Sequence, residues 1–215
     1  MSALSGSLKM SANPLQPRMT RRSLAKLQTR EKVLQAARQL FCERGYDAST
    51  IRDIALAAGM STGAVFASFS DKSDLFDEII NQDAAAMVGP MRAAAAGATT
   101  LESLVGLFEA AYRFQAGQIP LVQAWIAASW TRSADSEKSL RDSLQPIFVL
   151  IDEVLDRGVQ RGELAQTADL QLLSGMLWDL YIAGYRGAAH EGWTVESLTA
   201  DLKKRIGLIL KGATT

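Results

Sequence analysis

The sequence predicts an all-α protein of about nine helices, arranged as a small three-helix amino-terminal unit followed by a larger helical body. Three observations support this fold class. Glycine and proline are sparse, at 16 and 5 of 215 residues. Apolar residues recur at the i, i+3, i+4 and i+7 spacing of an amphipathic helix. No segment shows the apolar–polar alternation that is typical of a half-buried strand.

Composition excludes several classes of protein. No run of about 18 apolar residues is present, so we expect no membrane span. The single Cys42 excludes an internal disulfide, and one cysteine with one histidine, His190, excludes most zinc sites. The sequence contains no glycine-rich phosphate loop and no Ser–His–acid set. We therefore expect a cytoplasmic protein that has no cofactor and is not an enzyme, with Cys42 in the core rather than sensing oxidants.

The charge is unevenly distributed along the chain, although the formal net charge is zero. Residues 1–52 carry ten Lys or Arg against three acidic residues, a net charge of +7, and the rest carries −7. A basic end on an acidic body favours contact between that end and a polyanion. Residues 1–22, rich in Ser, Pro and Met, are expected to form a flexible basic arm.

The first two helices follow from local signals. The first should run over residues 23–44, and Gly45 should end it. Thr50 to Asp53 has the pattern of a capping box, so a second short helix should begin after Thr50. The inner face of the first helix is expected to contain Val33, Ala37, Leu40 and Phe41.

The third and fourth helices follow directly. Gly59 should end the second helix, and Ser61 is a good N-cap for a third that closes near Phe69. Ser70 or Asp71 should cap a fourth helix that continues into the 90s. Its buried face is expected to contain Leu75, Phe76, Ile79 and Ile80.

A weak segment, AAAAGATT at residues 93–100, is expected to join the fourth helix to five more. The long seventh helix contains Pro146, which should kink it. The five expected helices cover residues 101–117, 120–132, 137–162, 169–191 and 195–211. We therefore divide the chain into the arm at 1–22, a head at 23–70 and a regulatory body at 71–215.

The second and third helices have the spacing of a helix-turn-helix. Helices that cross steeply need a small residue where their backbones approach, and Ala55 meets this need. The turn needs a residue at positive φ, which Gly59 provides. The third helix needs an apolar residue that faces the second, and Val65 lies at that position. The spacing alone does not distinguish this motif from an ordinary helical hairpin.

Residues 30–79 resemble the DNA-binding domain of the TetR family of one-component regulators. The resemblance is carried by "AARQLFCERGY" at 36–46, "TIRDIALAAGMSTG" at 50–63 and "FSDKSDL" at 69–75. It covers about fifty residues closely, and the body resembles the family mainly in its number of helices. The resemblance implies that the third helix lies in the major groove of double-stranded DNA, where its small residues bring the backbone close to base edges.

The family pattern implies base contacts from the third helix and phosphate contacts from the residues around it. Lys72 matches the family's phosphate-binding lysine. The DNA-binding residues implied are Thr29, Arg30, Thr50, Ser61, Thr62, Gly63, Ala64, Phe66, Ser68 and Lys72.

The sequence departs from the family pattern at two of these positions. The family usually has tyrosine at the position of Phe66 and often histidine or tyrosine at that of Ser68. Phe66 should keep the packing of the ring but loses a hydroxyl that commonly reaches a phosphate. We hypothesise that the basic arm, which includes Arg18 and Arg21, compensates for this lost contact. Deletion of residues 1–22 tests this through operator affinity and its dependence on salt.

The resemblance also implies a body that binds a small molecule. Aromatic and methionine side chains beside a kinked helix favour an adaptable apolar pocket, although each is individually more typical of a packed core. The expected pocket residues are Met87, Met91, Phe108, Tyr112, Trp125, Trp130 and Phe148.

The eighth and ninth helices carry broad apolar stripes that favour a homodimer interface, with burial inside one subunit as the alternative. A helix-turn-helix monomer reads too few base pairs to be selective, which also favours a twofold dimer. The expected interface residues are Leu173, Leu177, Leu180, Tyr181, Gly184, Leu198, Leu202 and Ile206.

The sequence and the resemblance together predict a dimeric repressor that binds a palindromic operator and is released by a mostly apolar small molecule. Such a ligand acts only to the extent that it prefers the state with the wrong head spacing. The alternative is a helical protein-interaction module of the same fold with weakened DNA binding.

Overall fold

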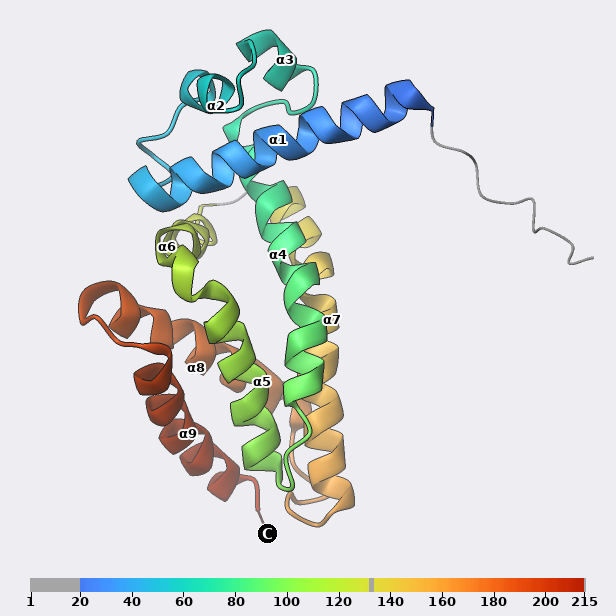
Figure 1. Ribbon diagram of the computed structural model, residues 1–215. Helices are drawn as coiled ribbons and strands as arrows, with labels where there is room; N and C mark the ends of the chain where they lie inside the picture. The colour runs from blue at the N-terminus through green and yellow to red at the C-terminus, as the bar shows by residue number, and fades with distance from the viewer. Residues whose placement is uncertain (1–19, 132–133, 215) are drawn as a thin grey trace, which may run out of the picture.

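The computed structural model describes residues 20–131 and 134–214. In these ranges the chain forms nine α-helices and one 3₁₀ turn, in agreement with the predicted fold class. Figure 1 shows α1 to α3 grouped at one end of the molecule, with α4 running from this group along the body that it forms with α5 to α9. No helix in the described ranges is both long and apolar enough to cross a bilayer.

The head contains α1 (Arg21–Arg44), α2 (Ile51–Ala57) and α3 (Thr62–Phe66). Helix α1 begins two residues earlier than expected because the Thr20 side chain caps it by accepting from the Ser23 amide at 3.1 Å. The expected arm therefore loses its last two residues to α1, and its first nineteen lie outside the described residues. Helix α3 ends three residues earlier than expected.

The body is built from α4 and five later helices. These are α4 (Lys72–Ala94), α5 (Thr100–Gln115), η1 (Ala116–Gln118), α6 (Ile119–Ala128), α7 (Ala134–Gln160), α8 (Leu170–His190) and α9 (Val195–Gly212). Helix α5 packs against α4, α7 and α9, and α8 packs against α6, α7 and α9. Helix α7 continues through Pro146, and the kink expected there stays a prediction.

One hydrophobic core runs from the head into the body. In the head, the rings of Phe41, Tyr46 and Phe76 form a cluster with centroids 4.7–5.9 Å apart. Phe76 belongs to the first turns of α4, so this helix completes the core of the head. The inner faces expected for α1 and α4 are both buried.

The head also touches the body directly, because α1 packs against α6 as well as against α4. This second contact places one face of α1 against the end of the body that contains η1 and α6. The head is therefore joined to the body through both α4 and α6.

Candidate nucleic-acid interface and body cavity

The turn between α2 and α3 has the expected geometry. Gly59 adopts φ +68°, a left-handed conformation that favours glycine. The Met60 amide donates to the Ala55 carbonyl at 2.8 Å, which closes the end of α2. Ala55 and Val65 are 2% and 0% exposed. The roles predicted for Ala55, Gly59 and Val65 in the helix-turn-helix are confirmed.

Helix α3 presents a low, exposed outer surface. Thr62, Gly63 and Phe66 are exposed, and Ala64 and Ser68 are half-buried. The Ser61 hydroxyl oxygen accepts from the Ala64 amide at 3.2 Å and holds the first turn. The face that turns away from the core therefore carries small side chains and a single large one.

Phe66 corrects one expectation. Its side chain is 55% exposed, so the ring does not pack into the head as expected from the family pattern. Leu56 on α2 is 80% exposed. An apolar ring on the outer surface of α3 is available for contact with thymine methyl groups, which are the apolar feature of the major groove.

Thr50 caps α2 reciprocally with Asp53. Its hydroxyl oxygen accepts from the Asp53 amide at 3.2 Å, and the Asp53 carboxylate accepts from the Thr50 amide at 3.1 Å and from its hydroxyl at 2.6 Å. The hydrogen bonds from the Thr50 hydroxyl and amide lower the pKa of the Asp53 carboxyl. This capping box was predicted and is confirmed.

Lys72 ties the start of α4 to the loop after α1. Its Nζ donates to the Tyr46 carbonyl at 2.9 Å and to the Asp47 carbonyl at 3.5 Å. It also lies 4.1 Å from the centroid of the Tyr46 ring, a cation–π contact. An ammonium has three hydrogens, so one donor remains for a phosphate. Its contact with DNA stays a prediction.

Arg30 supports the far end of α3 from inside the head. Its guanidinium donates to the Ser68 carbonyl at 2.8 Å, pairs with Glu78 at 3.0 Å and covers the Phe69 ring at 4.1 Å. These contacts make Arg30 a positioning residue for α3, a role that sequence reasoning missed. Thr29 beside it is half-buried. Phosphate contacts from both residues stay predictions.

The residues expected to form the ligand pocket do not come together. Met87, Met91, Phe108 and Tyr112 are at most 4% exposed and belong to the packed core. Trp130 is 86% exposed on the surface, because α6 ends at Ala128 before reaching it. Phe148 is half-buried against Trp178, with ring centroids 5.2 Å apart.

Two of the expected pocket residues line separate cavities. Tyr112 borders an open one of about 360 Å³ beside Trp193. Trp125 lines a smaller cavity at the end of the body that faces the head. This cavity holds about 20 Å³, room for about one water molecule. Its lining consists of Ile80, Asp83, Gln115, Gln118, Leu121, Val122, Trp125, Leu144, Trp178 and Tyr181. The polar members come from α4, α5, η1 and α8, which no local sequence signal brings together.

Most residues expected at the dimer interface are buried inside one subunit, which corrects that assignment. These buried residues are Leu173, Leu177, Tyr181, Leu198, Leu202 and Ile206. Leu180 and Gly184 are half-buried. A Cβ at Gly184 would collide with the Tyr112 hydroxyl, so this glycine serves the close packing of α5 and α8.

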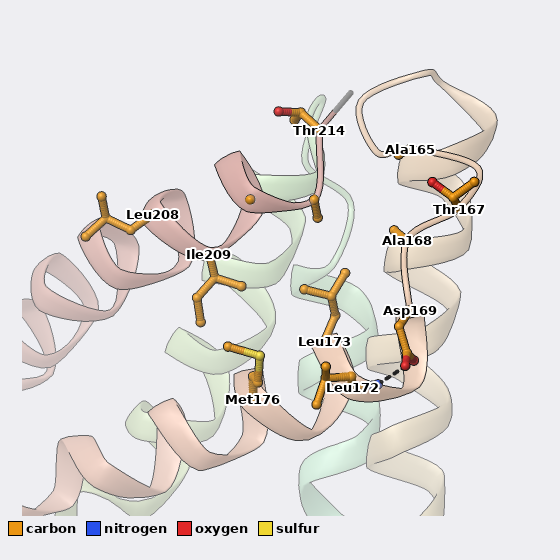
Figure 2. Close-up of a pocket in the computed structure, with 12 residues that line it drawn as sticks. Ala165, Thr167, Ala168, Asp169, Leu172, Leu173, Met176, Leu208, Ile209 and Thr214 are labelled. Atoms are coloured by element: carbon orange, nitrogen blue, oxygen red, sulfur yellow. Dashed lines mark hydrogen bonds between the residues drawn. The ribbon is translucent and has the colours of Figure 1, made fainter.

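A different apolar surface is exposed on α8 and α9. Leu172, Met176 and Leu208 are 61%, 39% and 68% exposed. They line one open groove of about 600 Å³, where Figure 2 shows Ile209 of α9 pointing toward Met176 of α8. The apolar stripes of α8 and α9 are broad, so part of each stripe packs into the core of the subunit and the rest is exposed to solvent.

The remaining polar candidates are unremarkable. Burial raises the pKa of the Cys42 thiol, which lowers its thiolate fraction and its reactivity. His190 is exposed in the last turn of α8. Within the described ranges, no group of three or more His, Cys, Asp or Glu side chains is placed to hold a metal ion.

Comparison with known proteins agrees with this geometry. Residues 33–79 match the family model described as bacterial regulatory proteins, tetR family. The chain is 44% identical to the transcriptional repressor BepR of Brucella suis over 64 residues, 30% of this chain and 31% of BepR. The matched region is thus about a third of that relative's length.

Solved structures extend the likeness to the body. Thermus thermophilus FadR, a repressor solved with lauroyl-CoA, is 28% identical, with a TM-score of 0.67 over 86% of this chain and 95% of that one. Bacillus subtilis FadR, solved with stearoyl-CoA, has a TM-score of 0.72 at 18% identity, over 82% and 96% of the two chains. With its capped helix-turn-helix, the region of residues 33–79 belongs to the tetR family of bacterial regulatory proteins, and the all-helical body shares the fold of these solved regulators.

Proposed function

We propose that this chain is a dimeric, sequence-specific DNA-binding repressor that a small molecule releases from a palindromic operator. One observation carries the proposal. A short, capped α3 presents a low exposed surface at one end of the molecule, within the region that matches the tetR family model. This surface suits insertion into the major groove. The chain then acts by binding, without catalysis or cofactor, on DNA in the cytoplasm.

The residues proposed to contact DNA divide by role. Thr62, Gly63, Ala64 and Phe66 on α3 would face the base edges, and Thr50 and Lys72 would contact phosphates. Arg30 would act mainly by holding the end of α3 in place. Positive charge concentrated before residue 53 would supply the general attraction to DNA, so affinity should fall steeply with salt.

We propose that dimerisation uses the exposed edge of α8 and α9. Leu172, Met176 and Leu208 are large, apolar and gathered at one groove, which is the character of a surface covered by a partner. A twofold copy at this face would present two α3 helices. These must lie about 34–36 Å apart to enter successive major grooves.

The effector would act through the body. The solved Thermus thermophilus FadR holds lauroyl-CoA, whose acyl chain supports an effector with a substantial apolar part. The cavity of about 20 Å³ is too small for such a ligand, so the state described here would be the ligand-free one. A ligand would stabilise an opened body and shift α4, the helix shared by head and body. We keep the proposed division into a DNA-binding head at 23–70 and a regulatory body at 71–215.

Selection of bound duplexes from a random pool tests the proposal. We expect a palindrome whose half-sites are one helical turn apart, and loss of binding in Thr62→Tyr, which adds bulk to the exposed face of α3. Val149→Tyr, on the exposed outer side of α7, is the matched control. No enriched sequence, or equal binding by Thr62→Tyr, would instead favour the protein-interaction module.

A further inference from the structure

The cavity beside the head contains a buried carboxylate. Asp83 on α4 is 6% exposed and is the only buried side chain among the described residues that carries a formal charge. It belongs to the cavity lining. Burying a carboxylate is costly unless a cation pairs with it, so the groups that face Asp83 decide what the cavity can bind.

The cation that pairs with Asp83 comes from the head. Nη1 of Arg38, on α1, donates to Oδ2 of Asp83 at 2.7 Å and to Oε1 of Gln118 at 2.6 Å. One guanidinium therefore joins α1 to α4 and to the η1 turn. Asp83 and Gln118 belong to the cavity lining, whereas Arg38, which joins them, does not.

The other walls of the cavity are aromatic, aliphatic or neutral and polar. The rings of Trp125 and Trp178 meet nearly at right angles, with centroids 6.2 Å apart. The Gln115 amide oxygen accepts from the Tyr181 hydroxyl at 2.6 Å and also from the Tyr185 hydroxyl. The Trp125 Nε1 hydrogen has no acceptor. No side chain in the lining is basic.

This arrangement discriminates between ligand charges. A carboxylate or phosphate that entered the cavity would meet Asp83 with no cation inside the lining. An ammonium would meet the carboxylate of Asp83 beside two tryptophan side chains, a residue type whose ring face attracts cations electrostatically. An ammonium on Oδ2 of Asp83 would compete with Arg38, because Nη1 of Arg38 donates to that oxygen.

We propose that the effector is an arylalkyl amine in its ammonium form, which binds Asp83 inside an enlarged cavity and displaces Arg38. The ligand selects the state in which Arg38 of α1 no longer bonds to Asp83 of α4 and Gln118 of η1. In this state the position of each head relative to its body is less fixed. The inference rests on the proposed function only for the effect on DNA. The amine site itself is a property of the body and is measured without DNA.

Three ligands of one shape test the charge requirement. They are 4-phenylbutylamine, 4-phenylbutan-1-ol and 4-phenylbutyrate, and binding to the full chain is followed by tryptophan fluorescence. We expect the amine to bind at least tenfold more tightly than the alcohol, and the butyrate to bind least. Equal affinity for amine and alcohol, or a preference for the butyrate, overturns the inference.

Two variants assign the effect to these residues. Asp83→Asn should remove the preference for amine over alcohol. Arg38→Gln should strengthen amine binding three- to tenfold, because Asp83 no longer has a competing partner, and a misfolded variant could not give this result. Retention of the preference in Asp83→Asn contradicts the site.

A DNA-binding measurement tests the amine site separately from the proposed repressor function. The amine should release wild-type protein from a duplex recovered by selection, and should release Asp83→Asn only at concentrations at least tenfold higher. If no duplex is recovered but the amine binds, the proposed repressor is wrong while the site stands. If a duplex binds but amine and alcohol are equivalent, the repressor stands and the site is wrong.

Discussion

At the scale of single residues, Phe66 determines the chemical character of the exposed face of α3. The ring is 55% exposed on the face of α3 that turns away from the core. Its neighbours on this face are small, so the ring is the largest group that α3 offers to DNA. A phenyl group gives apolar contact but cannot donate a hydrogen bond to phosphate.

Phe66→Tyr should therefore tighten operator binding by about tenfold or more, since a hydrogen bond to a charged group contributes about 1.5–3 kcal/mol. The dependence of affinity on salt should stay the same, because a tyrosine hydroxyl carries no charge and releases no counterion. Fluorescence anisotropy with a labelled operator at several salt concentrations measures both quantities. An unchanged affinity would mean that this position does not approach a phosphate.

The four tyrosines give a second residue-scale prediction. Burial raises the pKa of Tyr46, Tyr112, Tyr181 and Tyr185, which are all the tyrosines of the chain. The folded state keeps its protons above pH 10 while the unfolded state loses them, so the free energy of unfolding falls as pH rises above about 10.

Tyrosinate absorbance should consequently appear together with loss of helical circular dichroism rather than before it. A pH titration that records both signals checks this expectation. Ionisation of most tyrosines near pH 10 with full helicity retained would contradict the buried environment of these hydroxyls.

At the scale of elements, the helix-turn-helix depends on how its short helices begin and end. Helix α3 has only five residues, too few to be stable alone, so its Ser61 cap and the Gly59 turn must hold it. Arg30 fixes the other end through the Ser68 carbonyl. The position of α3 is therefore determined by the contacts of Gly59, Ser61 and Arg30 rather than by the helix propensity of its own residues.

Gly59→Ala should lower the free energy of unfolding by about 1 kcal/mol. A Cβ at this position meets no atom within 4 Å, so the whole cost comes from the left-handed backbone. Urea unfolding, followed by circular dichroism, measures it. Gly89→Ala is the matched control. It also meets no atom, but it lies inside α4, where alanine should stabilise by about 0.5–1 kcal/mol.

At the scale of the whole molecule, a repressor of this design needs a partner. The apolar groove at α8 and α9 would be covered in the proposed dimer, and its exposed leucines would then leave water. A charge placed there should oppose association while leaving the core of each subunit intact.

The double variant Leu172→Glu with Leu208→Glu should therefore be monomeric at concentrations where the wild type is dimeric, and it should bind the operator at least a hundredfold more weakly. Analytical ultracentrifugation and anisotropy check these outcomes. Val149→Glu, on a different helix with a comparable partly exposed side chain, should behave as wild type. A double variant that remains dimeric would place the interface elsewhere.

The sequence predicted the helices well because their signals are local. Thr50, Gly59 and Ser61 act within a few residues of their own positions, and each was found from its neighbours. The roles of Tyr181 and Leu202 were misassigned, because an apolar stripe does not show which subunit it packs against. The pair of Arg38 and Asp83 lies 45 residues apart in the chain, and neither residue carries a local pattern that indicates the other.

The position of Phe76 has a practical consequence for dissecting this molecule. Its ring contacts Phe41 and Tyr46 in the head, yet it lies on the helix whose later turns belong to the body. A polypeptide cut at residue 70 would leave Phe41 and Tyr46 uncovered and should fail to fold. A fragment designed to contain the DNA-binding head alone must therefore retain α4. Head and body of the full chain should unfold together on heating, in one cooperative transition.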